Sequence, residues 1–248
     1  MKTRRYGLIG YPLSHSFSRQ YFTEKFAAEG LRNHIYENFE LEDIWQLPAL
    51  LEEHPDLCGL NVTIPHKEAV VPYLDWLEDS ASRVGAVNTI KISRGRLSGY
   101  NTDYYGFRQS LINWLPDEPA AYRALVLGSG GAAKAVAAVL EELGIAYLIV
   151  SRKQQSGQLV YDDLPANKIL THTPLLINTT PLGMHPHTAS CPDIPYHHLT
   201  PEHFVYDLVY NPEETLLLQK ARERGAATKN GLEMLHLQAD RAWEIWSH

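Results

Sequence analysis

Gly128, Gly130 and Ala133 are the residues whose spacing most clearly indicates a chemical task, because they fit the pattern G-x-G-x-x-G/A. A short apolar run of strand type, residues 125–127, precedes them, and residues 132–143 carry apolar side chains at helical spacing. The first glycine permits a sharp turn, the second lets backbone N–H groups approach a pyrophosphate, and Ala133 lets helix and strand pack closely. The helix N-terminus then faces the anion. This stretch therefore predicts a dinucleotide-binding turn.

A second strand is expected at residues 146–150, and Ser151, Arg152 and Lys153 follow it directly. An NAD site usually places Asp or Glu here, about 20 residues after the first glycine, to hold the ribose 2′-hydroxyl. This sequence instead carries two adjacent cations, which suit a 2′-phosphate and favour NADP. The alternative interpretation is that Arg152 and Lys153 are a solvated basic pair in a loop. If only these two residues are considered, that interpretation is favoured. Their place directly after the strand favours the phosphate.

The first half of the chain contains a hydroxyl-rich turn. Ser14, Ser16 and Ser18 follow an expected strand at residues 6–10, and Ser18 is a suitable N-cap for the helix that comes next. Capping and turn formation account for part of this run. Three hydroxyls in five residues exceed what one cap needs, which indicates an oxygen-rich ligand.

Two ionisable residues of the first half are candidates for a positional role. Lys67 is expected in the first turn of a helix that begins at Pro65, where the helix dipole disfavours a cation. A surface lysine is the ordinary interpretation, but the unfavourable location indicates a specific task. Asp103 precedes an expected helix at residues 104–115 and, taken alone, would be interpreted as its N-cap.

Strands and helices alternate through both halves of the chain, which predicts an α/β protein. The expected strands are residues 6–10, 34–39, 57–63, 86–92, 96–99, 125–127, 146–150, 175–178 and 204–208. The expected helices are residues 18–30, 42–53, 104–115, 132–143, 213–224 and 232–246. A polar, Pro-rich break at residues 116–119 and a turn at residues 229–231 interrupt this pattern.

Composition narrows the class of protein. A length of 248 residues suits one large domain or two modest ones, and fractions of 44% hydrophobic and 21% charged residues are ordinary for a globular chain. A net charge of -7 argues against a general nucleic-acid binder. Cys58 and Cys191 are expected to be buried thiols, and the histidines of residues 185–198 to be loop residues without a metal. With no signal peptide or membrane span expected, a cytoplasmic location follows.

A series of motifs in this order resembles the shikimate dehydrogenase family over essentially the whole chain. The motifs are Gly10-Tyr11-Pro12, His15-Ser16-Phe17-Ser18, Asn61-Val62-Thr63-Ile64-Pro65-His66-Lys67, Gly85-Ala86-Val87-Asn88-Thr89, Asn101-Thr102-Asp103, Gly128-Ser129-Gly130-Gly131-Ala132, Asn178-Thr179-Thr180-Pro181-Leu182-Gly183, Tyr206-Asp207-Leu208-Val209-Tyr210 and Asn230-Gly231-Leu232 leading to Gln238. Any one of them could arise by chance, whereas the ordered set is highly specific.

The resemblance implies roles for individual residues. Lys67 and Asp103 would be the catalytic pair. The substrate carboxylate would be bound by Ser16 and Ser18 with help from Tyr210, and the ring hydroxyls and reacting oxygen by Thr63, Asn88 and Gln238 together with the catalytic pair. NADP would be bound by Gly128, Ser129, Gly130, Gly131, Ala132, Ser151, Arg152 and Lys153, with Thr179, Leu208 and Gly231 near the nicotinamide.

The resemblance also implies an architecture. Residues 1–103, completed by residues 231–248, would form an α/β substrate domain, residues 104–230 a Rossmann-type NADP domain, and the active site would occupy the cleft between them. The chain departs from the family pattern in three places: Arg19 stands where Pro is frequent, Tyr104-Tyr105 where smaller residues are common, and Glu233 where Gly is common. None of these changes removes a predicted catalytic or ring-binding side chain.

The implied reaction is the reversible NADPH-dependent reduction of 3-dehydroshikimate to shikimate, a step of chorismate and aromatic amino acid biosynthesis, by a monomer or homodimer. One alternative is a quinate/shikimate dehydrogenase that uses NAD, which the missing acid after the strand at residues 146–150 disfavours. A non-catalytic shikimate-binding regulatory protein is a second alternative, disfavoured by the presence of both Lys67 and Asp103. A bare dinucleotide-binding module would not explain the N-terminal motifs.

Overall fold

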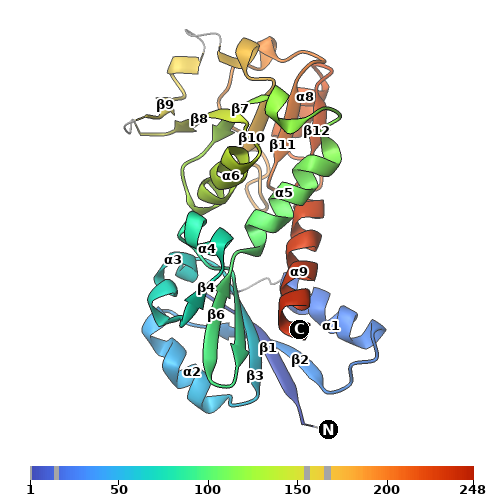
Figure 1. The fold of residues 1–248 in the computed structure, drawn as a ribbon. Coiled ribbons are helices and arrows are strands. Elements are labelled where there is room, and N and C mark those ends of the chain that lie inside the picture. Colours follow the sequence, from blue (N-terminus) through green and yellow to red (C-terminus); the bar gives the residue numbers. More distant parts are fainter. Residues whose placement is uncertain (1, 14–16, 154–156, 165–168) are drawn as a thin grey trace. The chain divides into compact units, whose positions relative to one another are not determined.

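The computed structural model describes residues 2–13, 17–153, 157–164 and 169–248, which fold into two compact units (Figure 1). The first unit comprises Met1–Thr102 with Ala239–His248, and the second comprises Asp103–Gln238. Each unit contains one six-stranded sheet with helices in the connections between strands. The predicted α/β fold class is thereby confirmed.

The sheet of the first unit has the strand order β2-β1-β3-β5-β6-β4. Strands β2, β1 and β3 run parallel, and β5 runs antiparallel to both β3 and β6. The strands are β1 (Arg4–Gly10), β2 (His34–Glu40), β3 (Leu57–Val62), β4 (Trp76–Leu77), β5 (Thr89–Ser93) and β6 (Arg96–Tyr100). The α-helices are α1 (Phe17–Ala28), α2 (Leu47–Glu53), α3 (His66–Ala69) and α4 (Asp79–Val84).

Both faces of this sheet are covered, and β1 and β3 are buried along most of their length, as expected for strands that pack on two sides. Alternate residues of β1 enter different clusters: Tyr6 packs with α1 and the C-terminal helix, and Ile9 packs with Leu47 of α2. On the first of these faces, a Cβ at Gly59 would lie 2.3 Å from the indole nitrogen of Trp246. That indole donates a hydrogen bond to the Ile90 carbonyl (2.9 Å), so the end of the chain completes the core of the first unit.

The sheet of the second unit is entirely parallel, with the order β12-β11-β10-β7-β8-β9. Numbered along the chain from β7, this is the order 6-5-4-1-2-3 of a doubly wound Rossmann-type sheet. The strands are β7 (Arg123–Leu127), β8 (Ala146–Ser151), β9 (Leu159–Val160), β10 (Leu175–Asn178), β11 (Phe204–Asp207) and β12 (Ala227–Lys229). The helices are α5 (Thr102–Trp114), α6 (Gly131–Glu142), α8 (Leu216–Arg222) and the first part of α9 (Leu232–Ser247).

Several element boundaries differ from those expected. The helix expected at residues 213–224 is the shorter α8, because Thr215 caps it: its hydroxyl accepts the Leu218 N–H (3.4 Å). The helix expected at residues 42–53 begins as a 3₁₀ turn, Ile44–Gln46, before α2. Pro65 precedes α3 instead of beginning it. Part of the turn expected at residues 229–231 belongs to β12.

Helix α9 belongs to both units along its length, which places the structural division within it, between Gln238 and Ala239. Its first part packs on α5, where Gly106 allows close approach: a Cβ at Gly106 would lie 2.7 Å from the Met234 carbonyl oxygen. Its last part packs on α1 through Trp243 and Trp246. The predicted domain boundaries, 1–103 with 231–248 and 104–230, therefore differ from the compact units mainly in residues 231–238.

Candidate functional site

The centre of the second sheet contains the turn predicted to bind a dinucleotide. Strands β8 and β10 flank β7 on opposite sides, so the order of strands reverses at β7, where doubly wound proteins bind their ligands. Gly128, which follows β7, has a φ of +108°, a conformation that favours glycine. A Cβ there would also lie 2.6 Å from Thr179 Oγ1. Both the backbone conformation and the nearby Thr179 therefore favour glycine at position 128.

The backbone beyond Gly128 is accessible. Ser129, Gly130, Gly131 and Ala132 are all exposed, and Gly130 is the N-cap residue of α6. A Cβ at Gly130 or Gly131 would meet no described atom within 4 Å, so the space in front of the helix is open. Buried Ala133 packs the helix against the sheet. A pyrophosphate could therefore reach the N–H groups and the positive end of the dipole of a 12-residue helix.

The basic pair directly follows β8, the strand adjacent to this turn. The Gly128 N–H donates to the Val150 carbonyl (2.8 Å), and Ser151 ends β8 one residue later. Ser151 is buried, and its hydroxyl donates to the Lys153 carbonyl, which shapes the turn that exposes Arg152 and Lys153. The positive charge of Arg152 reaches Tyr161, whose pKa is raised by burial and partly lowered again by this guanidinium.

A second close approach of backbones occurs at Gly231. A Cβ there would lie 2.1 Å from the Leu208 carbonyl oxygen, so no larger residue fits without displacing the backbone. The Gly231 N–H donates to the Val209 carbonyl (3.1 Å), and the Leu208 N–H donates to the Asn178 carbonyl (3.0 Å). Thr179 is joined to the Leu127 carbonyl through its N–H (2.9 Å) and its hydroxyl (2.7 Å). The predicted residues Thr179, Leu208 and Gly231 thus lie in loops at the carboxyl ends of neighbouring strands.

A buried network, for whose members no role was predicted, holds these loops. The carboxylate of fully buried Asp207 accepts hydrogen bonds from the Asn178 side chain (2.9 Å), the Val209 N–H (3.1 Å) and the Thr215 hydroxyl (2.6 Å). Asn178 also accepts from the Thr180 hydroxyl (2.7 Å). Burial raises the pKa of Asp207, and the three donors oppose that shift. Asn178 and Asp207 stand within quoted motifs, so the motifs marked them although their function as supports was not recognised.

In the first unit, Asn88 lies in a corresponding polar network. It is buried, and its Oδ1 accepts from the Thr102 N–H (2.7 Å) and from the Thr102 hydroxyl (3.2 Å). The Thr89 hydroxyl lies 3.2 Å from that of Thr102 and donates to Asn88 Oδ1 (3.3 Å). These contacts fix the amide plane of Asn88 and direct its oxygen inward, which leaves Nδ2 as the group to offer a ligand.

The network extends to Ser18 through two residues that the sequence analysis did not single out. The Asn61 side chain donates to the Thr89 hydroxyl (3.2 Å) and accepts from the Tyr36 hydroxyl (2.7 Å). Tyr36 is buried, which raises the pKa of its phenol, and a hydrogen bond with Ser18 opposes the shift. Ser18 and Asn88, predicted to hold opposite parts of one substrate, are therefore connected inside one unit.

The remaining predicted residues are placed as follows. Lys67 is half-buried in α3 of the first unit, and its carbonyl accepts the Val87 N–H (2.8 Å). Thr63 follows β3, with its Cγ2 in the space that a Cβ at Gly10 would need. In the second unit, Asp103 occupies the first turn of α5, Gln238 lies on α9 and Tyr210 is exposed after β11. Ser16 lies outside the described residues.

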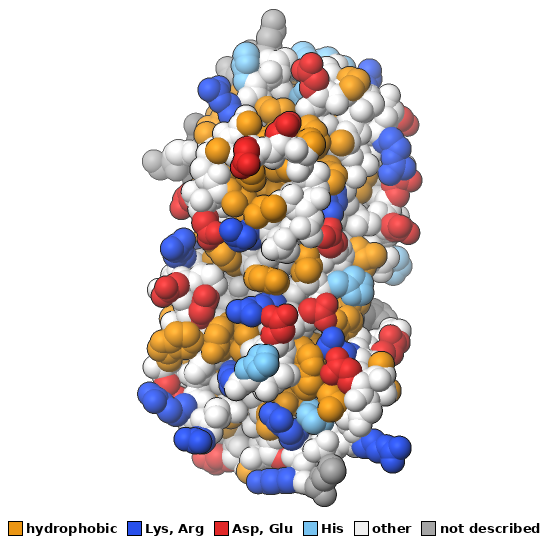
Figure 2. Space-filling view, turned by 45° about the vertical axis from the view of Figure 1, so that its right-hand side comes forward, with side chains coloured by type: hydrophobic (Ala, Val, Ile, Leu, Met, Phe, Trp, Pro, Cys, Tyr) orange, Lys and Arg blue, Asp and Glu red, His pale blue; other side chains and the backbone are white. Residues whose placement is uncertain are grey.

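The described residues also bear on metal binding and on membrane insertion. Among the described residues, no group of three His, Cys, Asp or Glu side chains is arranged to hold a metal ion. No helix in these ranges combines the length and apolar character needed to cross a bilayer. The face shown in Figure 2 carries Lys and Arg side chains interspersed with Asp and Glu, in contrast to the continuous basic surface that binds a polyanion.

The sheet order, the glycine turn at its centre and the basic end of β8 define a Rossmann-type dinucleotide-binding protein, with a second α/β unit in the same chain. The family model described as the shikimate dehydrogenase substrate binding domain matches residues 8–90. A relative from Symbiobacterium thermophilum named Shikimate dehydrogenase (NADP(+)) is 42% identical over 97% of this chain and 87% of its own. The chain belongs to the shikimate dehydrogenase family.

Solved structures agree with this assignment. Shikimate 5-dehydrogenase from Thermus thermophilus, in complex with NADP(H) and shikimate, is 32% identical, covers 99% of this chain and 94% of its own, and has a TM-score of 0.85. A ligand-free 5-ketofructose reductase of a Gluconobacter species is 29% identical over 99% of this chain and 93% of its own, with a TM-score of 0.84. The shared fold therefore includes proteins named for different substrates, so the substrate must be argued from the site.

Proposed function

We infer that this chain is a shikimate dehydrogenase, which interconverts 3-dehydroshikimate and shikimate with NADP(H) in the pathway to chorismate and the aromatic amino acids. The observation that carries the inference is the exposed turn Gly128–Ala132 at the reversal of a parallel sheet, next to Arg152, in a chain that matches this family over nearly its whole length. When bound, the nicotinamide supplies or accepts a hydride at the carbon that carries the reacting oxygen.

The residues of the second unit fit this cofactor. Ser129, Gly130, Gly131 and Ala132 would bind the pyrophosphate through backbone N–H groups, because their backbone is accessible. Gly128, whose N–H donates to the Val150 carbonyl, would contribute to this site by forming the turn. Arg152 and Lys153 would bind the 2′-phosphate, with Ser151 shaping their turn. Thr179, Leu208 and Gly231 would border the nicotinamide, since they lie in loops at the carboxyl ends of the neighbouring strands β10, β11 and β12.

The substrate residues divide by chemistry. Ser16, Ser18 and Tyr210 are proposed to bind the substrate carboxylate through their hydroxyl groups. Thr63, Asn88 and Gln238 are proposed to bind ring hydroxyls, with Asn88 donating from Nδ2 because its oxygen is occupied by Thr102. Tyr36 and Asn61 would hold Ser18 and Asn88 in place from inside the sheet.

Lys67 and Asp103 are proposed to handle the proton. As hydride reaches the carbonyl carbon, negative charge develops on its oxygen, and the Lys67 ammonium would stabilise that charge and supply the proton. In the oxidative direction the amine would take the proton back. Asp103 would orient the ammonium and one ring hydroxyl.

We also propose the roles of the two domains, the assembly state and the location of the protein. Residues 1–103 with 231–248 would act as the substrate domain and residues 104–230 as the NADP domain. A monomer or homodimer in the cytoplasm is proposed, without a nucleic-acid partner, in keeping with a net charge of -7.

The test follows the absorbance of the reduced cofactor: its loss when 3-dehydroshikimate or 5-ketofructose is supplied with NADPH, and its gain when shikimate or quinate is supplied with NADP or NAD. We expect turnover with 3-dehydroshikimate and a kcat/KM for shikimate at least about 100-fold above that for quinate, because quinate must fit one more hydroxyl near the serines. Comparable values for the two acids would favour the quinate/shikimate alternative. Binding of shikimate without turnover would favour the regulatory alternative, and preference for 5-ketofructose would refute the substrate assignment.

A further inference from the structure

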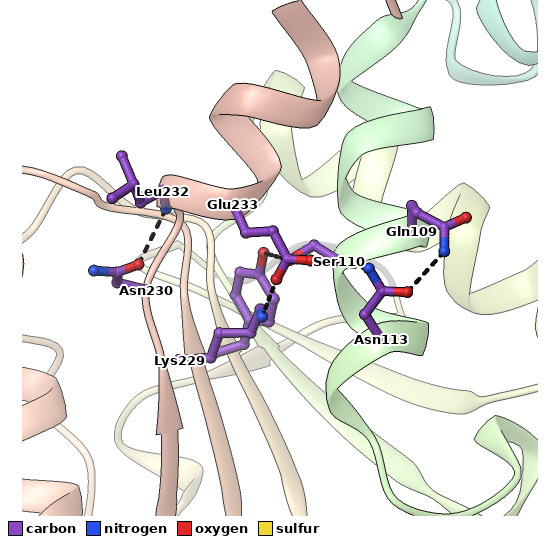
Figure 3. Close-up of polar contacts among 8 residues, drawn as sticks. Gln109, Ser110, Asn113, Lys229, Asn230, Leu232 and Glu233 are labelled. Carbon is purple, nitrogen blue, oxygen red and sulfur yellow. Dashed lines mark hydrogen bonds and ion pairs between the residues drawn. The ribbon is translucent and has the colours of Figure 1, made fainter. Parts of the chain in front are cut away.

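Glu233, the second residue of α9, is the centre of a polar cluster within the second unit (Figure 3). Its carboxylate accepts hydrogen bonds from the Ser110 hydroxyl (3.2 Å) and the Asn113 side-chain amide (2.9 Å), both on α5. It also forms an ion pair with Lys229, the last residue of β12. One acidic side chain therefore joins α5, β12 and α9.

The donors that face Glu233 are themselves oriented by neighbours. Tyr206 of β11 is fully buried and donates from its hydroxyl to Ser110 Oγ (2.9 Å), which leaves the Ser110 proton for Glu233. On the outer side, the Gln109 amide donates to Asn113 Oδ1 (2.8 Å), which turns Asn113 Nδ2 toward the carboxylate. The cluster thus extends from the sheet to the surface of the unit.

Close helix packing lies next to this cluster. Gly106, Ser110 and Asn113 have the spacing of one face of a helix. A Cβ at Gly106 would lie 2.7 Å from the Met234 carbonyl oxygen and 3.1 Å from Gln238 Cβ. Since the backbones touch at Gly106 and the polar cluster ties them one turn farther along, α9 is fixed in both rotation and translation against α5.

The carboxylate is suited to this task by its charge. Partial burial raises the pKa of Glu233, but the hydrogen bonds from Lys229, Asn113 and Ser110 outweigh it, and the net shift is downward. The side chain is therefore ionised at neutral pH. Its position in the first turn of α9 adds a favourable interaction with the helix dipole.

We propose that Glu233 is a positioning residue for the reaction: by tying the first turn of α9 to α5, it sets the placement of Gly231 for the nicotinamide and of Gln238 for the substrate. Gly231 precedes Glu233 by two residues and contacts Leu208, and Gln238 follows farther along the helix. Asp103 lies in the first turn of the same α5 to which Glu233 is tied. This proposal rests on the proposed function, because it assigns a purpose to the placement of those three residues.

The competing explanation is that Glu233 stabilises the fold without affecting the reaction. The two differ in what truncation changes. Loss of a purely stabilising contact lowers the melting temperature and leaves kcat and KM of the folded enzyme unchanged. Loss of positioning lowers kcat and raises KM for shikimate at temperatures where the protein is fully folded, since small misplacements of reacting groups cost up to about 100-fold.

The experiment compares Glu233→Ala and Glu233→Gln with Glu244→Ala as the matched control. Glu244 lies on the same helix and pairs with Arg241 of that helix (2.8 Å), so its loss removes an ion pair without detaching α9 from α5. We expect Glu233→Ala to lower kcat/KM for shikimate about 10- to 100-fold with NADP affinity within about 2-fold of the parent. Glu233→Gln keeps an oxygen for Ser110 or Asn113, so its kcat/KM for shikimate should stay within about 3-fold of the parent value. The control Glu244→Ala should have the kcat/KM of the parent.

Hydrogen exchange supplies a readout that does not depend on catalysis. Glu233→Ala should speed amide exchange in residues 229–238 and leave residues 239–247 unchanged. Parent-like kinetics in folded Glu233→Ala, or a Glu233→Gln variant as impaired as Glu233→Ala, would overturn the proposal. A parent protein inactive toward shikimate would instead refute the proposed function, and unchanged exchange in residues 229–238 would overturn the tie to α5 in either case.

Discussion

The two units present their candidate binding groups in opposite ways. At the carboxyl ends of its strands, the second unit presents backbone: Gly130 is exposed beside open space, while at Gly128 and Gly231 a neighbouring loop fills the place of a Cβ. The first unit instead presents side chains such as Asn88, oriented by buried partners. A dinucleotide offers phosphates that backbone N–H groups can bind, whereas a small polyol acid requires hydroxyl-by-hydroxyl recognition. The difference supports the proposed division between cofactor binding by the second unit and substrate chemistry by the first.

The largest expected effect is on the chemical step that is assigned to the first unit. Lys67→Ala should lower kcat by roughly 10²–10⁴-fold, the usual scale for a lost acid–base group, with a much smaller change in KM for shikimate. Steady-state rates with saturating NADP measure this. The control is Lys91→Ala, which removes a lysine of β5 in the same unit and should leave kcat and KM at the parent values. Near-normal kcat in Lys67→Ala would remove Lys67 from the chemical step.

The next effect concerns the cofactor in the second unit. Arg152→Ala should lower kcat/KM with NADP by roughly 10- to 100-fold and change it little with NAD, since a hydrogen bond to a charged group contributes about 1.5–3 kcal/mol. Lys153→Ala should cost less, and Ser151→Asp should shift preference toward NAD by repelling the phosphate. Both cofactors are compared in all variants. Equal losses with NAD and NADP for Arg152→Ala would make the residue structural.

A smaller effect is expected in the buried network that holds Ser18 and Asn88 in the first unit. Tyr36→Phe removes a buried hydroxyl that donates to Asn61 (2.7 Å), and leaving that acceptor without its donor should lower the free energy of unfolding by about 1–3 kcal/mol. KM for shikimate should rise several-fold because Ser18 loses its partner. Tyr147→Phe, whose hydroxyl bonds to exposed Glu141, is the control. Denaturant unfolding and kinetics are the measurements, and unchanged stability and KM would exclude Tyr36 as a support.

The smallest effect depends on pH. The pKa of Glu233 lies below its usual 4.5, because hydrogen bonds from Lys229, Asn113 and Ser110 outweigh the opposing effect of partial burial. Its ionised form therefore stabilises the fold above pH 4.5, and that contribution is lost as pH falls through the folded pKa. The difference in unfolding free energy between the parent and Glu233→Gln should be constant near neutrality and shrink in acid. If the difference in unfolding free energy instead grows as pH falls, the pKa of Glu233 is raised by folding and not lowered.

Sequence reasoning was most successful where structure depends on local pattern. The family and the α/β class are confirmed, and Gly128 and Gly130 lie between a strand and a helix as predicted, because the turn, its strand and its helix are contiguous. The strands β4 and β12 were not predicted, since they contain two and three residues and carry no measurable periodicity. The supporting networks were also missed: Tyr36 and Asn61 are 25 residues apart, and only the folded sheet brings them together.

The predicted site residues differ in how far their surroundings support them. Asn88 and Ser18 have neighbours that orient them, and Arg152 and Lys153 are exposed directly after β8, the strand next to the glycine turn. Their functional roles, with those of Lys67, Asp103, Tyr210 and Gln238, stay predictions. Glu233 was noted as a departure from the family pattern, and the structure supplies a physical reason for a carboxylate at that position.

The division of work between the two units is tested most directly by calorimetric titration of NADP into Lys67→Ala and Arg152→Ala. The account predicts that Lys67→Ala, although nearly inactive, binds NADP within about 2-fold of the parent, while Arg152→Ala binds it about 10- to 100-fold more weakly. Equal weakening in both variants, or unchanged binding in Arg152→Ala, would contradict the assignment of cofactor recognition to the second unit and of chemistry to the first.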